Sequence, residues 1–182
     1  MPVRNSSERY GSVAQALHWA IVVLLIVQFT LGKIADDLPP GLDRLITLAR
    51  HKSFGITILA LAVIRLLWRL INRPPPLPSM PGWQRMAAHL SHAGLYALLF
   101  AMPLTGWLMS SAHNYPVSWF GLVQLPDLIT PDRDLSHDLE DIHELLSNIL
   151  LGLAAVHVLA ALKHQFVDRD GLLLRMLPWP PR

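Results

Sequence analysis

The residues best suited to chemistry in this sequence are histidines inside or next to long apolar segments. An ionisable group within a membrane span is costly to bury, so such a residue indicates function. The interval between His143 and His157 corresponds to about 21 Å of helix rise and returns to nearly the same helix face. One helix would therefore carry imidazoles at two depths in the membrane. His51 is expected at the depth of His143, and His18 at the depth of His157. The sequence predicts two stacked sites, each formed by two histidines from different helices.

Sites with only two protein ligands favour haem over other metal groups. Zinc usually has three or four protein ligands, whereas a porphyrin supplies four nitrogens and leaves haem iron two axial positions. The chain contains no Cys, which excludes thiolate zinc sites, iron–sulfur clusters and covalent haem attachment. We therefore expect two molecules of haem b. Because both axial positions would be filled, the iron is expected to transfer electrons and not to bind dioxygen.

Each of these histidines also has an ordinary explanation. His18, followed by Trp19, fits the aromatic belt at a membrane surface. His51, expected just ahead of a helix, fits a solvated basic loop, and His143, expected to open a helix, fits a capping region. His157 fits a buried histidine with a hydrogen-bond partner. The matching depths of all four favour the ligand interpretation.

Three further residues are candidates for the surroundings of these sites. Arg65 lies on the same expected helix as His51, at the other level, and could pair with a haem propionate; snorkelling to the membrane surface is an equal alternative. His164 and His92 are candidates for a quinone pocket, and His164 is also a rival ligand or an interfacial residue. The remaining histidines are expected at the headgroups or in solvent: His89, His113 and His137.

The elements that must position these residues are membrane helices. Of the 182 residues, 52% are hydrophobic and 15% are charged, whereas about 25% of an average soluble domain is charged. The same composition excludes a disordered chain. Apolar runs long enough to cross a hydrocarbon core of about 30 Å predict an all-α, integral membrane four-helix bundle that forms one domain over residues 1–182. The expected helices cover residues 14–32, 54–71, 92–111 and 142–166.

The distribution of charge predicts the orientation. Ten of the 15 Lys and Arg residues lie at the two termini and around the proline-rich second linker, residues 72–91, which places both termini in the cytoplasm. Ten of the 13 acidic residues lie on the opposite, periplasmic side. We expect a multi-pass protein of a bacterial inner membrane, with the lipid bilayer and not nucleic acid as its partner. The ten basic residues are Arg4, Arg9, Arg65, Arg69, Arg73, Arg85, Lys163, Arg169, Arg175 and Arg182.

Short motifs in a fixed order cover nearly the whole chain. They include the four candidate ligands and the carboxyl-terminal segment, and a proline-rich linker follows the third motif. They are LHW at 17–19, HxxxG at 51–55, RLLWR at 65–69, AHLxH at 88–92, PxxG at 103–106, WFG at 119–121, HExL at 143–146, GLxAxH at 152–157 and LLRMLP at 173–178. In this order and spacing they resemble the bacterial cytochrome b561 family of four-helix membrane cytochromes with two haems.

The resemblance implies ligands, partners and an activity. It makes His51 and His143 the ligands of the periplasmic haem, and His18 and His157 those of the cytoplasmic haem, which agrees with the depth argument. It implies quinone as an electron partner and, for the best-known member, oxidation of superoxide to dioxygen with reduction of ubiquinone. Attraction of an anion needs positive charge, which Lys33, Arg44, Arg50 and Lys52 could supply, but residues 127–144 carry seven carboxylates that oppose it.

Three functions remain open from the sequence. The first is a diheme oxidoreductase that moves electrons between a periplasmic donor, small molecule or redox protein, and the quinone pool. The second is a membrane anchor without its own turnover. It would carry electrons between quinone and a soluble redox partner that docks on the long acidic linker, residues 112–141. The third is a metal transporter in which His143 and Glu144 bind the passing cation.

Overall fold

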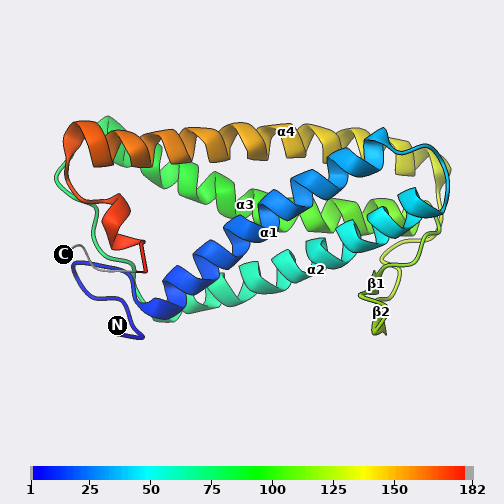
Figure 1. The fold of residues 1–182 in the computed structure, drawn as a ribbon, viewed down its shortest axis with the longest axis horizontal. Coiled ribbons are helices and arrows are strands. Elements are labelled where there is room, and N and C mark those ends of the chain that lie inside the picture. The colour runs from blue at the N-terminus through cyan, green and yellow to red at the C-terminus, as the bar shows by residue number, and fades with distance from the viewer. Residues whose placement is uncertain (1, 179–182) are drawn as a thin grey trace.

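Four long helices make up most of the computed structural model, which describes residues 2–178 (Figure 1). Each of the four is long and apolar enough to cross a membrane, so the predicted all-α four-helix architecture is confirmed. A π-helical turn, His164–Asp168, and a 3₁₀ turn, Leu173–Arg175, follow the last helix. The four helices are α1, Ser12–Asp37; α2, Leu42–Ile71; α3, Gly82–Ala112; and α4, Arg133–Lys163.

The helices extend well beyond the predicted apolar runs. Helix α2 begins at Leu42 and not at residue 54, and α4 begins at Arg133 and not at residue 142. Hydrogen bonding along a helix does not stop at the edge of the hydrocarbon, and Asp132 caps α4 by accepting a hydrogen bond from the Leu135 amide (3.0 Å). His51 and His143 therefore lie inside helices, and the expectation that they stand at helix starts was wrong.

A small β-hairpin interrupts the segment between α3 and α4. Strands β1, Ser118–Trp119, and β2, Val123–Gln124, pair in antiparallel fashion, and Gly121 has a positive φ of 74° in the turn. The hairpin packs on α2, because the Trp119 indole donates to the Thr57 hydroxyl (3.0 Å). The sequence did not predict these strands. We call this end of the bundle the hairpin end and the end that carries both chain termini the terminal end (Figure 1).

An apolar cluster fills the middle of the bundle. Its buried members are Ile21 of α1, Ile58 and Ala62 of α2, and Leu99 of α3. Only 6–17% of the residues in the most apolar stretch of each helix are buried inside the protein, so most apolar side chains remain at least partly accessible, as expected for a surface covered by lipid.

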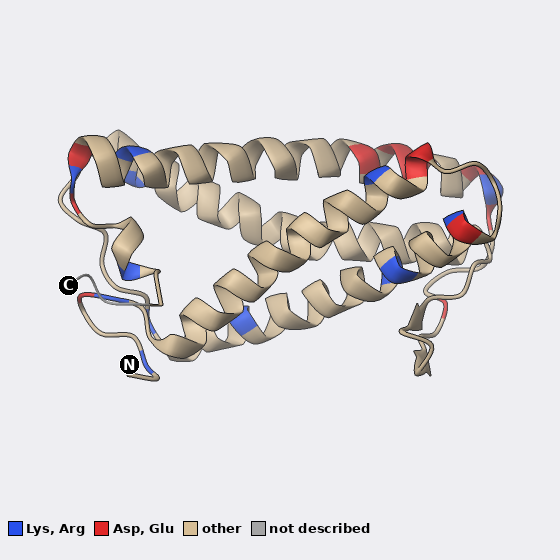
Figure 2. Cartoon of the chain, in the orientation of Figure 1, with Lys and Arg blue, Asp and Glu red and all other residues tan. Residues whose placement is uncertain are grey.

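Charged residues gather toward the two ends of the bundle, with acidic residues concentrated on α4 at the hairpin end (Figure 2). This separation leaves the central part of each helix apolar, as a membrane span requires. Arg182 lies outside the described residues. The placement of the terminal end in the cytoplasm stays a prediction from the distribution of Lys and Arg.

Candidate metal centres

Two imidazoles face each other at the hairpin end. His51 comes from α2 and His143 from α4, and their ring centroids lie 6.3 Å apart with an angle of 71° between the ring planes. Both side chains are half-buried. The structure thus brings together the two histidines that the sequence assigns to one level.

The hydrogen bonds of His143 define which nitrogen is free. The Thr105 hydroxyl donates its single proton to the Met102 carbonyl (2.9 Å), and its oxygen lies 3.0 Å from Nδ1 of His143. Because that hydroxyl has no second proton, it accepts from Nδ1–H of His143. Nε2 of His143 then carries the lone pair that a metal ion needs.

Two glycines lie directly against the imidazoles at the hairpin end. A Cβ atom on Gly106 of α3 would lie 3.1 Å from Cε1 of His143, and one on Gly32 of α1 would lie 3.5 Å from Cε1 of His51. The absent side chains allow α1 and α3 to approach the two rings closely. The buried Nδ1 of His51 has no hydrogen-bond partner within the described part of the chain, so this ring retains unused donor and acceptor capacity.

A second pair of imidazoles faces across the terminal end. His18 of α1 and His157 of α4 have ring centroids 6.4 Å apart and ring planes at 74°. His92 of α3 lies closer to His157, with 5.4 Å between centroids. Three imidazoles therefore meet at this end, and the sequence did not predict the contact between His92 and His157.

Ring separation distinguishes which of these pairs fits an axially coordinated iron. The bond from a metal ion to an imidazole nitrogen is about 2.0–2.1 Å long, as found for zinc, and the centre of the ring lies ~1.1 Å behind that nitrogen. Two imidazoles on opposite sides of one metal ion therefore have ring centres about 6.3 Å apart. The pairs His51–His143 and His18–His157 match this value at 6.3 and 6.4 Å, whereas 5.4 Å between His92 and His157 is too short. Together with the free Nε2 of His143, these separations fit bis-histidine haem.

Arg65 is held inside the terminal end by two neighbouring helices. Its Nε donates to the Tyr96 hydroxyl (3.2 Å), and one terminal nitrogen donates to the Ala14 carbonyl (3.4 Å). Arg69 also lies over the Tyr96 ring, with 5.6 Å from Cζ to the centroid. These contacts favour a place for Arg65 within the bundle over snorkelling to the membrane surface.

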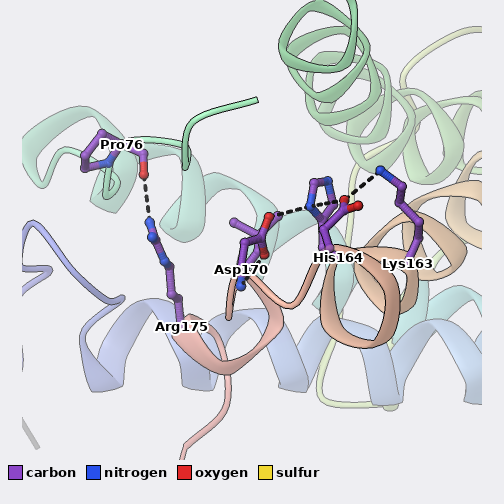
Figure 3. A network of polar contacts seen from close by, with 7 residues as sticks. Pro76, Lys163, His164, Asp170 and Arg175 are labelled. Carbon is purple, nitrogen blue, oxygen red and sulfur yellow. Dashed lines mark hydrogen bonds and ion pairs between the residues drawn. The ribbon is translucent and has the colours of Figure 1, made fainter. Parts of the chain in front are cut away.

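His164 lies in a carboxylate cluster at the end of α4 (Figure 3). It is buried, and its Nδ1 lies 2.6 Å from Asp170 and 3.1 Å from Asp168, which also pairs with Lys163 (2.6 Å). In the described part of the chain, His164 and His92 share no hydrogen bond or ring contact. The two candidates for a quinone pocket thus have separate immediate surroundings.

The carboxyl-terminal segment is bound to the first helix at the same end. Buried Gln15 donates to the carbonyls of Arg175 (3.2 Å) and Leu177 (3.0 Å), and the Trp19 indole donates to the Met176 carbonyl (2.9 Å). The Arg175 guanidinium donates in turn to the Pro76 carbonyl (2.8 Å; Figure 3). These bonds fix the segment after His164 against α1 and the proline-rich linker.

Apolar side chains lie between the two ends on three of the helices. Ile21 follows His18 on α1, Ile58 lies between His51 and Arg65 on α2, and Leu99 lies between the levels on α3. The two imidazole pairs are thus separated by packed hydrocarbon.

Sequence reasoning missed Thr105, Tyr96 and Gly32 as parts of these sites. The PxxG motif at 103–106 encloses Thr105, which was the available signal. Tyr96 lies one turn after His92 on a helix, but its contact with Arg65 depends on how α2 and α3 pack. That packing cannot be read from the spacing of residues on either helix alone.

Four membrane-spanning helices that place paired imidazoles toward both ends of the bundle are the architecture of a membrane electron-transfer cytochrome of the b type. A family model described as prokaryotic cytochrome b561 matches residues 9–179. The chain belongs to this family. It is therefore a haem-binding, multi-pass electron-transfer protein of the bacterial inner membrane.

Curated relatives resemble the chain over almost its full length. Cytochrome b561 homolog 2 of Escherichia coli (strain K12) is 36% identical over 187 residues, covering 97% of this chain and 95% of that protein. The probable superoxide oxidase CybB of Yersinia pestis is 30% identical over 172 residues, covering 94% and 97%. Cytochrome b562 of Cereibacter sphaeroides is 27% identical over 177 residues, covering 92% and 94%.

Proposed function

We propose that the chain holds two haem b groups and transfers electrons from a donor at the hairpin end to membrane quinone at the terminal end. His51 and His143 are the axial ligands of one haem, and His18 and His157 those of the other. The observation that carries this proposal is the nearly equal ring separation of the two pairs, 6.3 and 6.4 Å. Each haem supplies a one-electron iron couple when bound.

The surrounding residues have separate roles in this proposal. Thr105 holds His143 in the tautomer that leaves Nε2 free. Arg65 supplies a positive charge within the terminal end, where it suits a haem propionate. Lys52, next to His51, donates to Ser110 (3.1 Å) beside a cavity of about 170 Å³ that Tyr115 and Pro116 also line. This cavity is a suitable entry point for a small donor.

Quinone reduction also needs protons at the terminal end. His164 binds a carboxylate of Asp170 through Nδ1 (2.6 Å), so this pair can hold a proton at Nδ1 and pass it on. His164 and His92, which share no contact in the described part of the chain, are proposed as two separate polar groups for quinone. Reduction of one ubiquinone takes two electrons and two protons.

Superoxide is the proposed small donor, since the chain is similar to a probable superoxide oxidase. Two superoxide ions, one ubiquinone and two protons would give two molecules of dioxygen and one ubiquinol. Lys52 supports attraction of the anion, whereas Lys33 is neutralised by Asp37 at 3.0 Å.

The test uses purified haem-loaded protein with superoxide and a soluble ubiquinone. We expect two haems per polypeptide and quinone reduction faster than the uncatalysed reaction. One haem per polypeptide would contradict the ligand assignment. Two haems without faster quinone reduction would contradict superoxide as the donor and leave the diheme assignment standing.

A second candidate function follows from the acidic surface at the hairpin end (Figure 2). Carboxylates in residues 127–144 repel a small anion but could dock a positively charged soluble redox protein. The chain would then act as a membrane anchor that carries electrons without its own turnover. The third function, metal transport through His143 and Glu144, gains no support, because Glu144 is exposed while His143 faces His51.

A further inference from the structure

A third pair of imidazoles lies at the hairpin end, outside the two centres described above. His113 is the C-cap residue of α3, and His137 lies near the start of α4. Their ring centroids are 6.0 Å apart, with ring planes at 74°. The sequence placed both residues in a linker as solvated side chains, but the earlier start of α4 brings the two rings into an edge-to-face contact.

The ring of His113 is held in one orientation. Its Nδ1 lies 3.2 Å from the Met109 carbonyl, and the ring stacks on Tyr115 with 5.9 Å between centroids and 8° between planes. A carbonyl oxygen only accepts hydrogen bonds, so Nδ1 carries the proton. Nε2 of His113 therefore presents a lone pair, as in histidines that bind metal ions.

His137 has a carboxylate on its Nδ1 side. Oε2 of Glu140, three residues later on α4, lies 3.9 Å from this nitrogen. This distance exceeds that of a hydrogen bond, so the carboxylate adds negative charge beside the ring without fixing its tautomer. Nε2 of His113 is thus the nitrogen available to a shared ion, and His137 can offer either of its ring nitrogens.

The two rings line a common cavity. Its volume is about 410 Å³, and its lining includes His113, His137, Asn114 and Asp132. The surrounding start of α4 is rich in carboxylates, which favour a cation, although Arg133 also lines the cavity and opposes one. The space suits an ion that completes its coordination with water or with a carboxylate.

We propose that His113 and His137 form a binding site for a divalent transition-metal ion, of the class that prefers imidazole: Zn²⁺, Cu²⁺ or Ni²⁺. Bonds of about 2.0–2.1 Å from the metal to the two nitrogens place the ring centres about 5.1 Å apart in tetrahedral geometry and about 6.3 Å apart when the nitrogens are opposed. The observed 6.0 Å lies inside that range. His137 is exposed and can rotate to adjust the separation, whereas His113 is fixed.

The test measures zinc binding to the purified haem-loaded protein by equilibrium dialysis and metal analysis. Zinc is redox-inert toward haem, and a chain without Cys has no thiol sites to compete. We expect one zinc ion per polypeptide to be bound by the wild type. His113→Ala and His137→Ala should each weaken that binding roughly tenfold or more while the haem content, which reports the fold, stays unchanged.

Two control variants address other zinc ligands. His89→Ala removes an exposed histidine, and Asp168→Asn alters the cluster at His164, whose ligand atoms lie within 4.8 Å of one another. Both variants should bind zinc as the wild type does. The proposal is wrong if the wild type shows no saturable binding, or if zinc binding survives in the double variant His113→Ala/His137→Ala. Loss of zinc in Asp168→Asn alone would assign the ion to the other cluster.

A spectroscopic measurement identifies the ligands independently. Cu²⁺ added to the oxidised protein should give an electron paramagnetic resonance spectrum with coupling to imidazole nitrogen. That coupling should lose the contribution of one imidazole in His137→Ala, whose exposed side chain can be removed with little effect on packing. Unchanged nitrogen coupling in His137→Ala would overturn the proposal.

Discussion

The two proposed haem sites have the same ring spacing but different surroundings. At the hairpin end, the His51–His143 pair lies against Gly32, Gly106 and the Thr105 hydroxyl, all of them neutral, and the ammonium of the neighbouring Lys52 is bonded to Ser110 and to the Pro116 carbonyl. At the terminal end, a third imidazole and the Arg65 guanidinium lie near the His18–His157 pair. Ring spacing determines whether iron can be held, and the surroundings determine how readily it accepts an electron. A cation favours the reduced state, so we expect the terminal end to have the higher potential.

The largest expected effect is the loss of one haem from either end. His143→Ala should remove the haem of the hairpin end, and His157→Ala or His18→Ala that of the terminal end, because one axial ligand is lost in each case. Haem per polypeptide should fall from two to one. The control is His92→Ala, which should retain both haems. Loss of haem in His92→Ala with retention in His18→Ala would exchange their roles.

The next effect depends on the close approach of α3 to His143. In Gly106→Ala the new Cβ would lie 3.1 Å from the imidazole, and such overpacking costs about 1–3 kcal/mol. The hairpin-end haem should bind more weakly while the terminal-end haem is unaffected, as measured by haem retention during dilution. Gly152→Ala is the matched control, since a methyl group added there would have no neighbour within 4 Å; equal loss in both variants would point to the helix and not to the ring contact.

Removal of the positive charge at the terminal end should change only one potential. A unit charge at about 10 Å in an effective dielectric constant of about 20 contributes on the order of 1–2 kcal/mol, or about 40–90 mV for one electron. Arg65→Gln should therefore lower the midpoint potential of the terminal-end haem in a redox titration. Lys33→Gln, which removes an exposed and paired charge, should change neither potential. Equal shifts at both ends in Arg65→Gln would contradict the difference between the two sites.

The smallest effect is expected from the hydroxyl next to His143. Thr105→Val keeps the side-chain shape but removes the hydroxyl acceptor of His143 Nδ1–H and leaves only the Met102 carbonyl near it, which makes the imidazole a weaker electron donor. A lost hydrogen bond of about 0.5–1.5 kcal/mol should raise the hairpin-end potential by about 20–60 mV. Thr105→Ser keeps the hydroxyl and should keep the wild-type potential. A shift of similar size in Thr105→Ser would exclude the hydrogen bond as the cause.

Helical periodicity predicted much of this arrangement. The spacing of His143 and His157 on one helix, with a third and a fourth histidine at matching positions of two other helices, is local information. Apolar runs similarly give the number of spans, although they underestimate α2 and α4 because helices continue into the headgroup region. The ligand assignment itself stays a prediction until haem is measured.

Contacts between helices could not be predicted in the same way. The approach of His92 to His157 depends on the rotation of α3 against α4, and the pairing of Arg65 with Tyr96 depends on the packing of α2 against α3. The contact between His113 and His137 depends on where α3 ends and where α4 begins. Each of these features requires the relative placement of two elements, which one sequence does not contain.

The apolar cluster of Ile21, Ile58, Ala62 and Leu99 separates the two imidazole pairs, and this has a consequence for energy conversion. In the proposed function, an electron that moves from the hairpin end to the terminal end would cross this layer without a compensating ion, so its transfer would be electrogenic. A charge that crosses the whole membrane gains or loses about 2.3 kcal/mol per 100 mV. With the terminal end in the cytoplasm, an inside-negative voltage opposes inward electron transfer, and an energised cell should slow the protein relative to one with a collapsed voltage.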